Sequence, residues 1–201
     1  MKKTRLISAT VFTAIYLIFL SWYNGWGIDP FTDEEIRTLA SKVQDQPNSL
    51  VILEMLEDDD GGEFFMLNLN RYEYAENEPN QGVPASYQAY GQAVIRLLLK
   101  RASHPIYSGE LPDFLLNGNI ENETWDEVIL VRYRSKRDFI SMVTSDEYIK
   151  VFSKRTGGIE YATVTPSEAT INMTTPRFIV LIFLALLSLF VDRLIKRRGL
   201  V

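Results

Sequence analysis

Two long apolar runs lie near the ends of the chain, and a region of mixed apolar and polar residues separates them. The first run carries no charge between Arg5 and Asp29, and the second begins after Arg177 and reaches Asp192. At about 1.5 Å per residue, roughly 20 helical residues cross the ~30 Å hydrocarbon layer of a bilayer. The pattern therefore predicts transmembrane helices over residues 6–26 and 177–195.

Each run also has an alternative interpretation. The opening residues MKKTR are typical of the basic start of a cleaved signal peptide. However, the first run ends at Trp22, Tyr23 and Trp26 instead of the small residues of a cleavage site, which favours an uncleaved anchor. The second run could be a core helix of a folded domain, but it is apolar on all sides, which favours a membrane span.

Capping signals and periodicity predict the elements between the two runs. Thr32 and Glu35 form a capping box at the start of a helix. Residues 50–56 follow as either a second short helix or a strand. The remaining pattern predicts strands over residues 64–72, 125–133 and 159–165, an extended stretch over 104–116, a helix over 84–102, and two helices capped by Ser135 and Ser145.

The order of these elements predicts an α+β fold. A β-α-β-β-α-β succession over residues 63–168 is that of a ferredoxin-like domain with a four-stranded antiparallel sheet, and residues 27–62 precede it as a helical extension. We expect helices on one face of the sheet. The other face is expected to carry Phe64, Met66, Val128 and Leu130, and so apolar a face requires a cover. A second copy of the same sheet is the simplest cover, which predicts a homodimer that closes into an α/β barrel.

The charge distribution predicts the orientation in the membrane. Residues 26–176 hold 13 Lys and Arg against 25 Asp and Glu, and the other eight basic residues flank the apolar runs, seven of them on the terminal sides. Basic flanks stay in the cytoplasm. We therefore expect a two-pass protein of the inner (plasma) membrane, with cytoplasmic termini and a periplasmic or extracellular domain. An acidic domain repels phosphates, so we expect no nucleic-acid partner.

One stretch of sequence also resembles a known family. The segment WDEVILVRYRSKRDFISMVTSDEY is similar to the dimeric α/β-barrel superfamily, and most closely to its small family of uncharacterised function. The resemblance extends over residues 50–165 and implies the ferredoxin-like fold and the dimer, but no particular reaction. The sequence departs from the family at Arg134, where proline is common, and in its two flanking apolar runs. The matching positions are Trp125, Asp126, Val128, Leu130, Val131, Tyr133, Ser135, Phe139, Met142 and Tyr148.

Residues suited to chemistry are few. The chain has no cysteine and one histidine, His104, so a zinc or haem site would need carboxylate or tyrosine ligands, and we expect no metal or cofactor. Asn68 is polar within an apolar strand and must be hydrogen-bonded if buried. One hypothesis places it in a ligand pocket between sheet and helices, together with Tyr107, Arg132 and Tyr133. The alternative is that Asn68 bonds the neighbouring backbone and Tyr133 packs the core.

Two functions remain open from the sequence. The first is a membrane-anchored extracytoplasmic domain for dimerisation or for sensing a small ligand. The second is a membrane-anchored, cofactor-free enzyme, similar to a monooxygenase or an isomerase, that acts on a small apolar molecule. A cavity beside Asn68 would favour the second hypothesis, and a filled core would exclude it.

Overall fold

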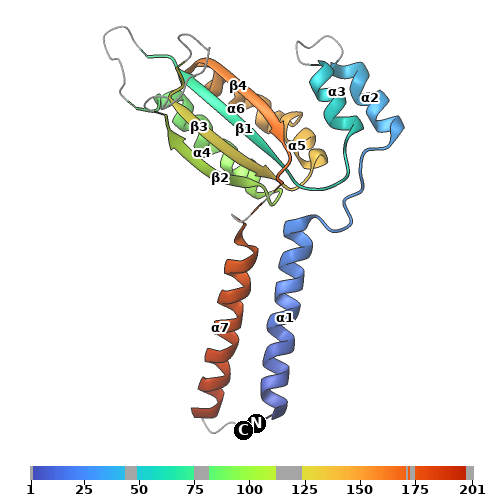
Figure 1. Ribbon diagram of the computed structural model, residues 1–201, viewed down its shortest axis with the longest axis vertical. Coiled ribbons are helices and arrows are strands. Elements are labelled where there is room, and N and C mark those ends of the chain that lie inside the picture. Colours follow the sequence, from blue (N-terminus) through green and yellow to red (C-terminus); the bar gives the residue numbers. More distant parts are fainter. Residues whose placement is uncertain are drawn as a thin grey trace. The chain divides into compact units, whose positions relative to one another are not determined.

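The computed structural model describes residues 2–43, 49–74, 82–111, 124–170, 172 and 175–197, and divides the chain into two compact units. One unit contains the two terminal helices, and the other comprises residues 27–170. Figure 1 labels all the helices and strands.

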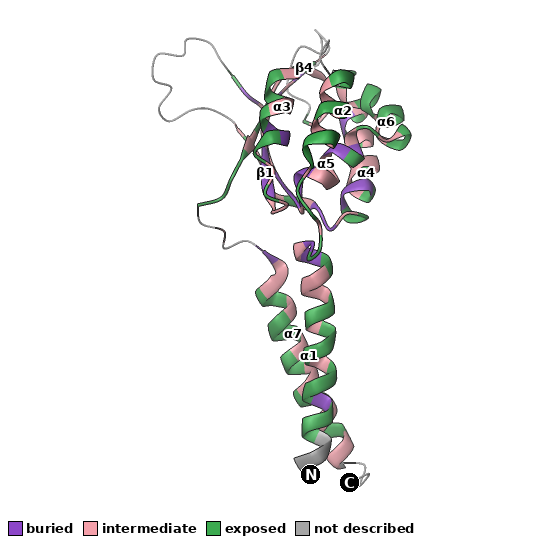
Figure 2. Cartoon of the chain, turned by 90° about the vertical axis from the view of Figure 1, so that its right-hand side faces the viewer, coloured by how far each residue is buried: buried purple, intermediate pink, exposed green. Residues whose placement is uncertain are grey.

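The terminal unit consists of α1 (Lys2–Asn24) and α7 (Pro176–Arg197), which pack against each other in opposite directions. Arg5 forms an ion pair with Asp192 at 3.0 Å near one end, and Arg177 donates to Asn24 at 2.8 Å near the other. Both helices are long and apolar enough to cross a membrane, by length and composition. Only 6% of each apolar window is buried, and Figure 2 shows the exposed surface along both helices. This exposure is unlike that of a buried core helix.

The second unit has the predicted ferredoxin-like fold. Its four strands form one antiparallel sheet in the order β2-β3-β1-β4. Helices α4, α5 and α6 lie together behind the sheet in Figure 1. The elements in chain order are β1 (Phe64–Tyr72), α4 (Ala85–Leu99), β2 (His104–Glu110), β3 (Glu127–Tyr133), α5 (Lys136–Val143), α6 (Asp146–Thr156) and β4 (Ile159–Ser167).

Local capping chemistry sets the boundaries that the sequence predicted. The Ser135 hydroxyl caps the start of α5 by accepting a hydrogen bond from the Asp138 amide at 3.0 Å. The Ser145 hydroxyl caps the start of α6 in the same way, by accepting from the Tyr148 amide at 3.2 Å. The strand predicted over residues 64–72 is β1. The extended stretch predicted over residues 104–116 ends as β2 at Glu110, and residues 112–116 lie outside the described part of the chain.

The helical extension comprises α2 (Asp33–Val43) and α3 (Ser49–Glu57). The capping box is confirmed, because the Thr32 amide donates to the Glu35 carboxylate at 2.9 Å and the Glu35 amide donates to the Thr32 hydroxyl at 3.3 Å. The segment that the sequence left open between helix and strand is a helix. Its buried residues are Met55 and Leu56.

Arg137 of α5 attaches the start of this extension to the domain. Its guanidinium donates to both oxygens of Glu35, at 2.6 and 3.0 Å, and to the carbonyl oxygens of Asp29 and Pro30. The same group lies 4.3 Å from the centre of the Phe31 ring. Hydrogen bonds from Arg137 and Thr32 lower the pKa of Glu35 to about 2, so this carboxylate stays charged at neutral pH.

The two faces of β1 are assigned differently from the sequence expectation. Phe64 and Met66 belong to the core cluster with Leu97, Leu98 and Met142 of the helices, so they lie on the covered face. The prediction that they lie on the other face was wrong. Alternation separates two sets of residues in a strand, but it does not say which set meets the helices when both are apolar.

The uncovered face carries the alternate residues. Leu67 pairs with Leu130 across the β1–β3 ladder, and Leu69 pairs with Val128. Directly paired residues share a face of a sheet, so Val128 and Leu130 lie on the expected side, with Leu67 and Leu69 in place of Phe64 and Met66. Phe65 belongs to the same side of β1 but is buried. In Figure 1, the face of the sheet away from α4, α5 and α6 is turned toward the viewer.

Candidate functional site

A pocket lies between α4 and the covered face of the sheet. Its volume is about 130 Å³. A cavity of roughly 150 Å³ holds a benzene molecule, so the space suits a ligand with one small ring. The lining residues are Asn68, Tyr87, Tyr90, Gly91, Val94, Ile95, Leu98, Pro105, Ile129, Val131, Tyr133 and Arg155.

Gly91 leaves part of this space open, because it lines the pocket without a side chain. Tyr87, Gly91, Val94 and Leu98 follow one another at helical spacing, so they form one stripe of α4 directed at the sheet. A Cβ atom built at Gly91 meets nothing within 4 Å. A glycine in the interior of a helix costs about 0.5–1 kcal/mol relative to alanine. The stripe therefore has a gap at its centre where a side chain would otherwise pack.

Phenol groups surround much of the pocket. Burial raises the pKa of Tyr133, Tyr90 and Tyr87 above the ordinary value for tyrosine. The neighbouring Tyr148 also contributes to the raised pKa of Tyr90. Because these phenols stay protonated at neutral pH, they present O–H groups that can donate to an acceptor in the pocket.

A polar network behind the pocket holds Tyr87. The Asn70 side chain is fully buried, and its amide nitrogen donates to the Tyr87 hydroxyl at 2.9 Å and to the Glu127 carboxylate at 3.4 Å. The hydroxyls of Tyr72 and Ser108 also donate to that carboxylate. Burial and the neighbouring carboxylate raise the pKa of Tyr72. These bonds position the Tyr87 ring at the pocket wall.

The structure brings two of the four predicted site residues to this pocket. Asn68 and Tyr133 both line it. The Asn68 amide nitrogen donates to the Met66 carbonyl at 3.1 Å and to the Ile129 carbonyl at 3.5 Å. This is the backbone bonding that the alternative interpretation of Asn68 required. Asn68 therefore bonds the backbone, as the alternative interpretation required, and also lines a pocket, as the first hypothesis required.

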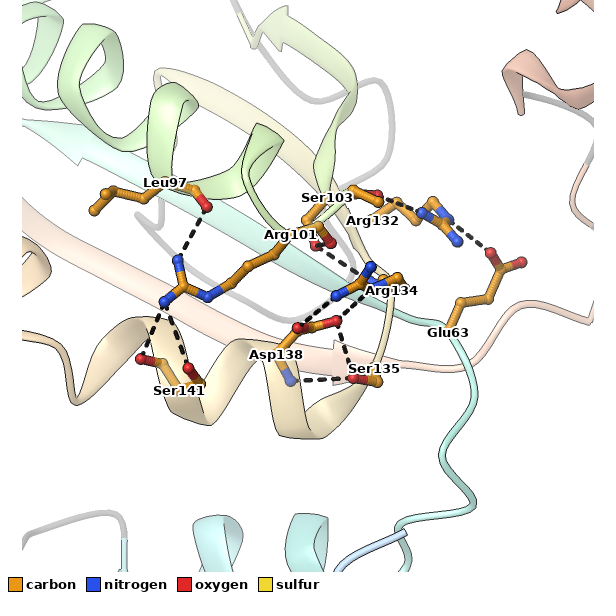
Figure 3. Close-up of polar contacts among 10 residues, drawn as sticks. Glu63, Leu97, Arg101, Ser103, Arg132, Arg134, Ser135, Asp138 and Ser141 are labelled. Carbon is orange, nitrogen blue, oxygen red and sulfur yellow. Dashed lines mark hydrogen bonds and ion pairs between the residues drawn. The ribbon is translucent and has the colours of Figure 1, made fainter. Parts of the chain in front are cut away.

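Tyr107 and Arg132 lie on the opposite face of the sheet. Tyr107 pairs with Leu130, and its side chain lies over Gly109 on that face. Arg132 is fully buried, and its guanidinium donates to Glu63 at 2.6 Å and to the Ala102 carbonyl at 2.7 Å. Figure 3 shows this guanidinium directed toward Glu63. Neither residue lines the pocket with Asn68 and Tyr133.

The most informative pocket residues were not predicted as site residues from the sequence. Gly91 had a signal, because it interrupts an apolar stripe inside a predicted helix. Arg155, near the end of α6, had none, because a basic residue in the last turn of a helix ordinarily interacts with the helix dipole. Within the described residues, no group of three or more His, Cys, Asp or Glu side chains is arranged to hold a metal ion.

The chain matches no protein-family model and no curated protein. Among solved structures, it is similar to RPA0582, a protein of unknown function from Rhodopseudomonas palustris. The TM-score is 0.53 at 21% identity, over 63% of this chain and 97% of that one. The methylated form of RPA0582 gives a TM-score of 0.54 at 21% identity, over 64% and 96% of the two chains.

A further similarity is to a dabb family protein with a ferredoxin-like fold from Mesorhizobium loti, with a TM-score of 0.38 at 5% identity, over 54% of this chain and 98% of that one. The strand order and the likeness to RPA0582 agree with the fold that the resemblance implied. The chain contains a ferredoxin-like domain, and its fold is similar to that of RPA0582.

Proposed function

We propose that this protein is a membrane-anchored domain that binds a small ligand in the pocket between α4 and the sheet. The observation that carries the proposal is the gap at Gly91, which leaves about 130 Å³ beside Asn68 and three tyrosines. Protein interiors are close-packed, and few voids exceed the size of a water molecule. A lined pocket of this size between α4 and the sheet is therefore a candidate binding site.

The lining residues favour binding over catalysis. The pocket wall, as far as the structure describes it, contains no carboxylate, histidine or cysteine. General acid–base catalysis needs a group whose pKa lies near the working pH, and burial moves the phenols at the wall away from it. The cavity beside Asn68 was the result expected for a cofactor-free enzyme, but its wall supplies contacts and hydrogen bonds without a base.

Filling the gap tests this proposal. We expect Gly91→Leu to lower the affinity for benzamide, a neutral ligand with one ring, at least ~10-fold, because the new side chain occupies most of the ligand volume. The full chain would be purified in detergent, and the affinity measured by titration calorimetry against detergent blanks. Leucine favours helix by up to ~1 kcal/mol over glycine, so the variant is expected to fold.

The control for that experiment is Gln92→Leu, which adds the same side chain to the next residue of α4, at an exposed position. It should bind benzamide as the natural chain does. If the natural chain binds no benzamide, or if Gly91→Leu binds it equally well, the pocket is not the binding site for such ligands.

We further propose that α1 and α7 span the inner membrane and hold residues 27–170 on the extracytoplasmic side. Their opposite directions and the basic residues beyond each outer end support this orientation. Alkaline phosphatase is active only outside the cytoplasm. Fused after Val201 it should be inactive, and inserted at Gly82 it should be active; the reverse pattern would contradict the proposed topology.

The uncovered sheet face supports a homodimer. Its central residues, Leu67, Leu69, Val128 and Leu130, are apolar and lie on the side of the sheet away from α4, α5 and α6. We propose that the same face of a second copy covers them. Such a contact is symmetric, so each protomer presents the same residues to its partner.

A further inference from the structure

Arg155 has an unusual environment for a charged side chain. It comes from α6 and lines the pocket, and its Nη2 atom is buried with no hydrogen-bond partner. No ion pair joins it to a carboxylate in the described parts of the chain. The guanidinium is charged at every physiological pH, so the domain carries an uncompensated cation at the pocket wall.

The other arginines in comparable positions have partners. Arg132 pairs with Glu63 at 2.6 Å, Arg134 pairs with Asp138 at 2.6 Å, and Arg137 pairs with Glu35 at 2.6 Å. Figure 3 shows two of these pairs around the start of α5. Arg155 is half-buried and its Nη2 atom is fully buried, and a charged group withdrawn from water ordinarily has a partner. The contrast indicates that the partner of Arg155 comes from outside the described chain.

The groups beside Arg155 are suited to an anion. Arg155 lines the same pocket as Tyr87, Tyr90 and Tyr133, and its charge offsets part of the rise in their pKa. Protonated phenols donate hydrogen bonds, and so does a guanidinium, which matches the planar geometry of a carboxylate. The rest of the wall is apolar and includes Val94 and Ile129.

We infer that the pocket is selective for a small monocarboxylate. Its carboxylate pairs with Arg155 and accepts from the neighbouring phenols, and its apolar body, no larger than one ring, lies in the gap at Gly91. A carboxylate fits better than a phosphate, because a small volume with apolar walls leaves little room for a second charge. This inference rests on the proposed function and adds the chemical class of the ligand.

Benzoate and benzamide provide the test, because they have nearly the same size and shape but differ in charge. We expect the full chain in detergent to bind benzoate roughly 10–100-fold more tightly than benzamide, since hydrogen bonds to charged groups are stronger. Arg155→Met should remove this preference and retain benzamide binding. Lys154→Met, which removes an exposed positive charge from the preceding residue, should keep the preference.

The outcomes separate this inference from the proposed function. If both compounds bind equally and Gly91→Leu weakens both, the pocket binds ligands but the selectivity is refuted. If neither binds, the proposed function fails as well. If Arg155→Met does not fold, Arg155→Lys replaces it, because lysine keeps the positive charge but lacks the planar guanidinium. Its preference for benzoate should be intermediate. A preference equal to that of the natural chain would contradict the proposed pairing of the guanidinium with the carboxylate.

Discussion

Arg132→Ala is expected to lower the free energy of unfolding of residues 27–170 by about 3–5 kcal/mol, the usual effect of removing one partner from a buried ion pair. The guanidinium is fully buried, and the substitution removes the hydrogen bonds that it donates to Glu63 and to the Ala102 carbonyl. Ala102 has a positive φ of 50°, so Arg132 also bonds a strained turn at the end of α4. Because folded domains are stable by about 5–15 kcal/mol, the variant should be marginal.

Arg71→Ala is the matched control. Arg71 forms an ion pair with Glu160 at 3.0 Å from a strand of the same sheet, but the two side chains are 41% and 55% exposed. Its removal should cost less than ~1 kcal/mol. Urea unfolding of the full chain in detergent, monitored through hydrogen exchange of the β1 and β3 amides, compares the stabilities of the two variants. Equal losses would show that burial of the Arg132 pair does not matter.

Much of the fold was predictable from local signals in the sequence. The Thr32 and Glu35 capping box and the serine caps at Ser135 and Ser145 act within a few residues, so the sequence displays them directly. The face of β1 was not predictable in this way. Both its odd and even positions are apolar, and the packing of α4 and α5 decides between them.

The site was less predictable because it depends on contacts between distant elements. Asn68 and Tyr133 were expected at a pocket and line one, since each stands out within its own strand. Tyr107 and Arg132 occur in neighbouring strands, but the register of the sheet places them on the opposite face. Arg155 reaches the pocket only because α6 packs beside α4, a contact between residues far apart in the chain.

Leu130→Lys is expected to raise the dissociation constant of the proposed homodimer at least ~100-fold. Leu130 lies at the centre of the uncovered face, paired with Leu67 on one side and Tyr107 on the other. In a symmetric interface, one substitution introduces two lysines, and each loses its hydration without gaining a carboxylate partner. A long lysine side chain can extend to water from the separate protomer, so the fold of that protomer should persist.

Light scattering of the full chain in detergent, corrected for the mass of the micelle, gives the oligomeric state. Val164→Lys is the control, because Val164 is 45% exposed and pairs with Asn68, on the face of the sheet away from Leu130. The natural chain and Val164→Lys should be dimers, and Leu130→Lys a monomer. A natural chain that is monomeric at every concentration would refute the dimer, and a dimeric Leu130→Lys would move the interface to another surface. Since the pocket lies on the covered face, benzoate binding by the Leu130→Lys monomer would then show whether ligand recognition needs the second copy.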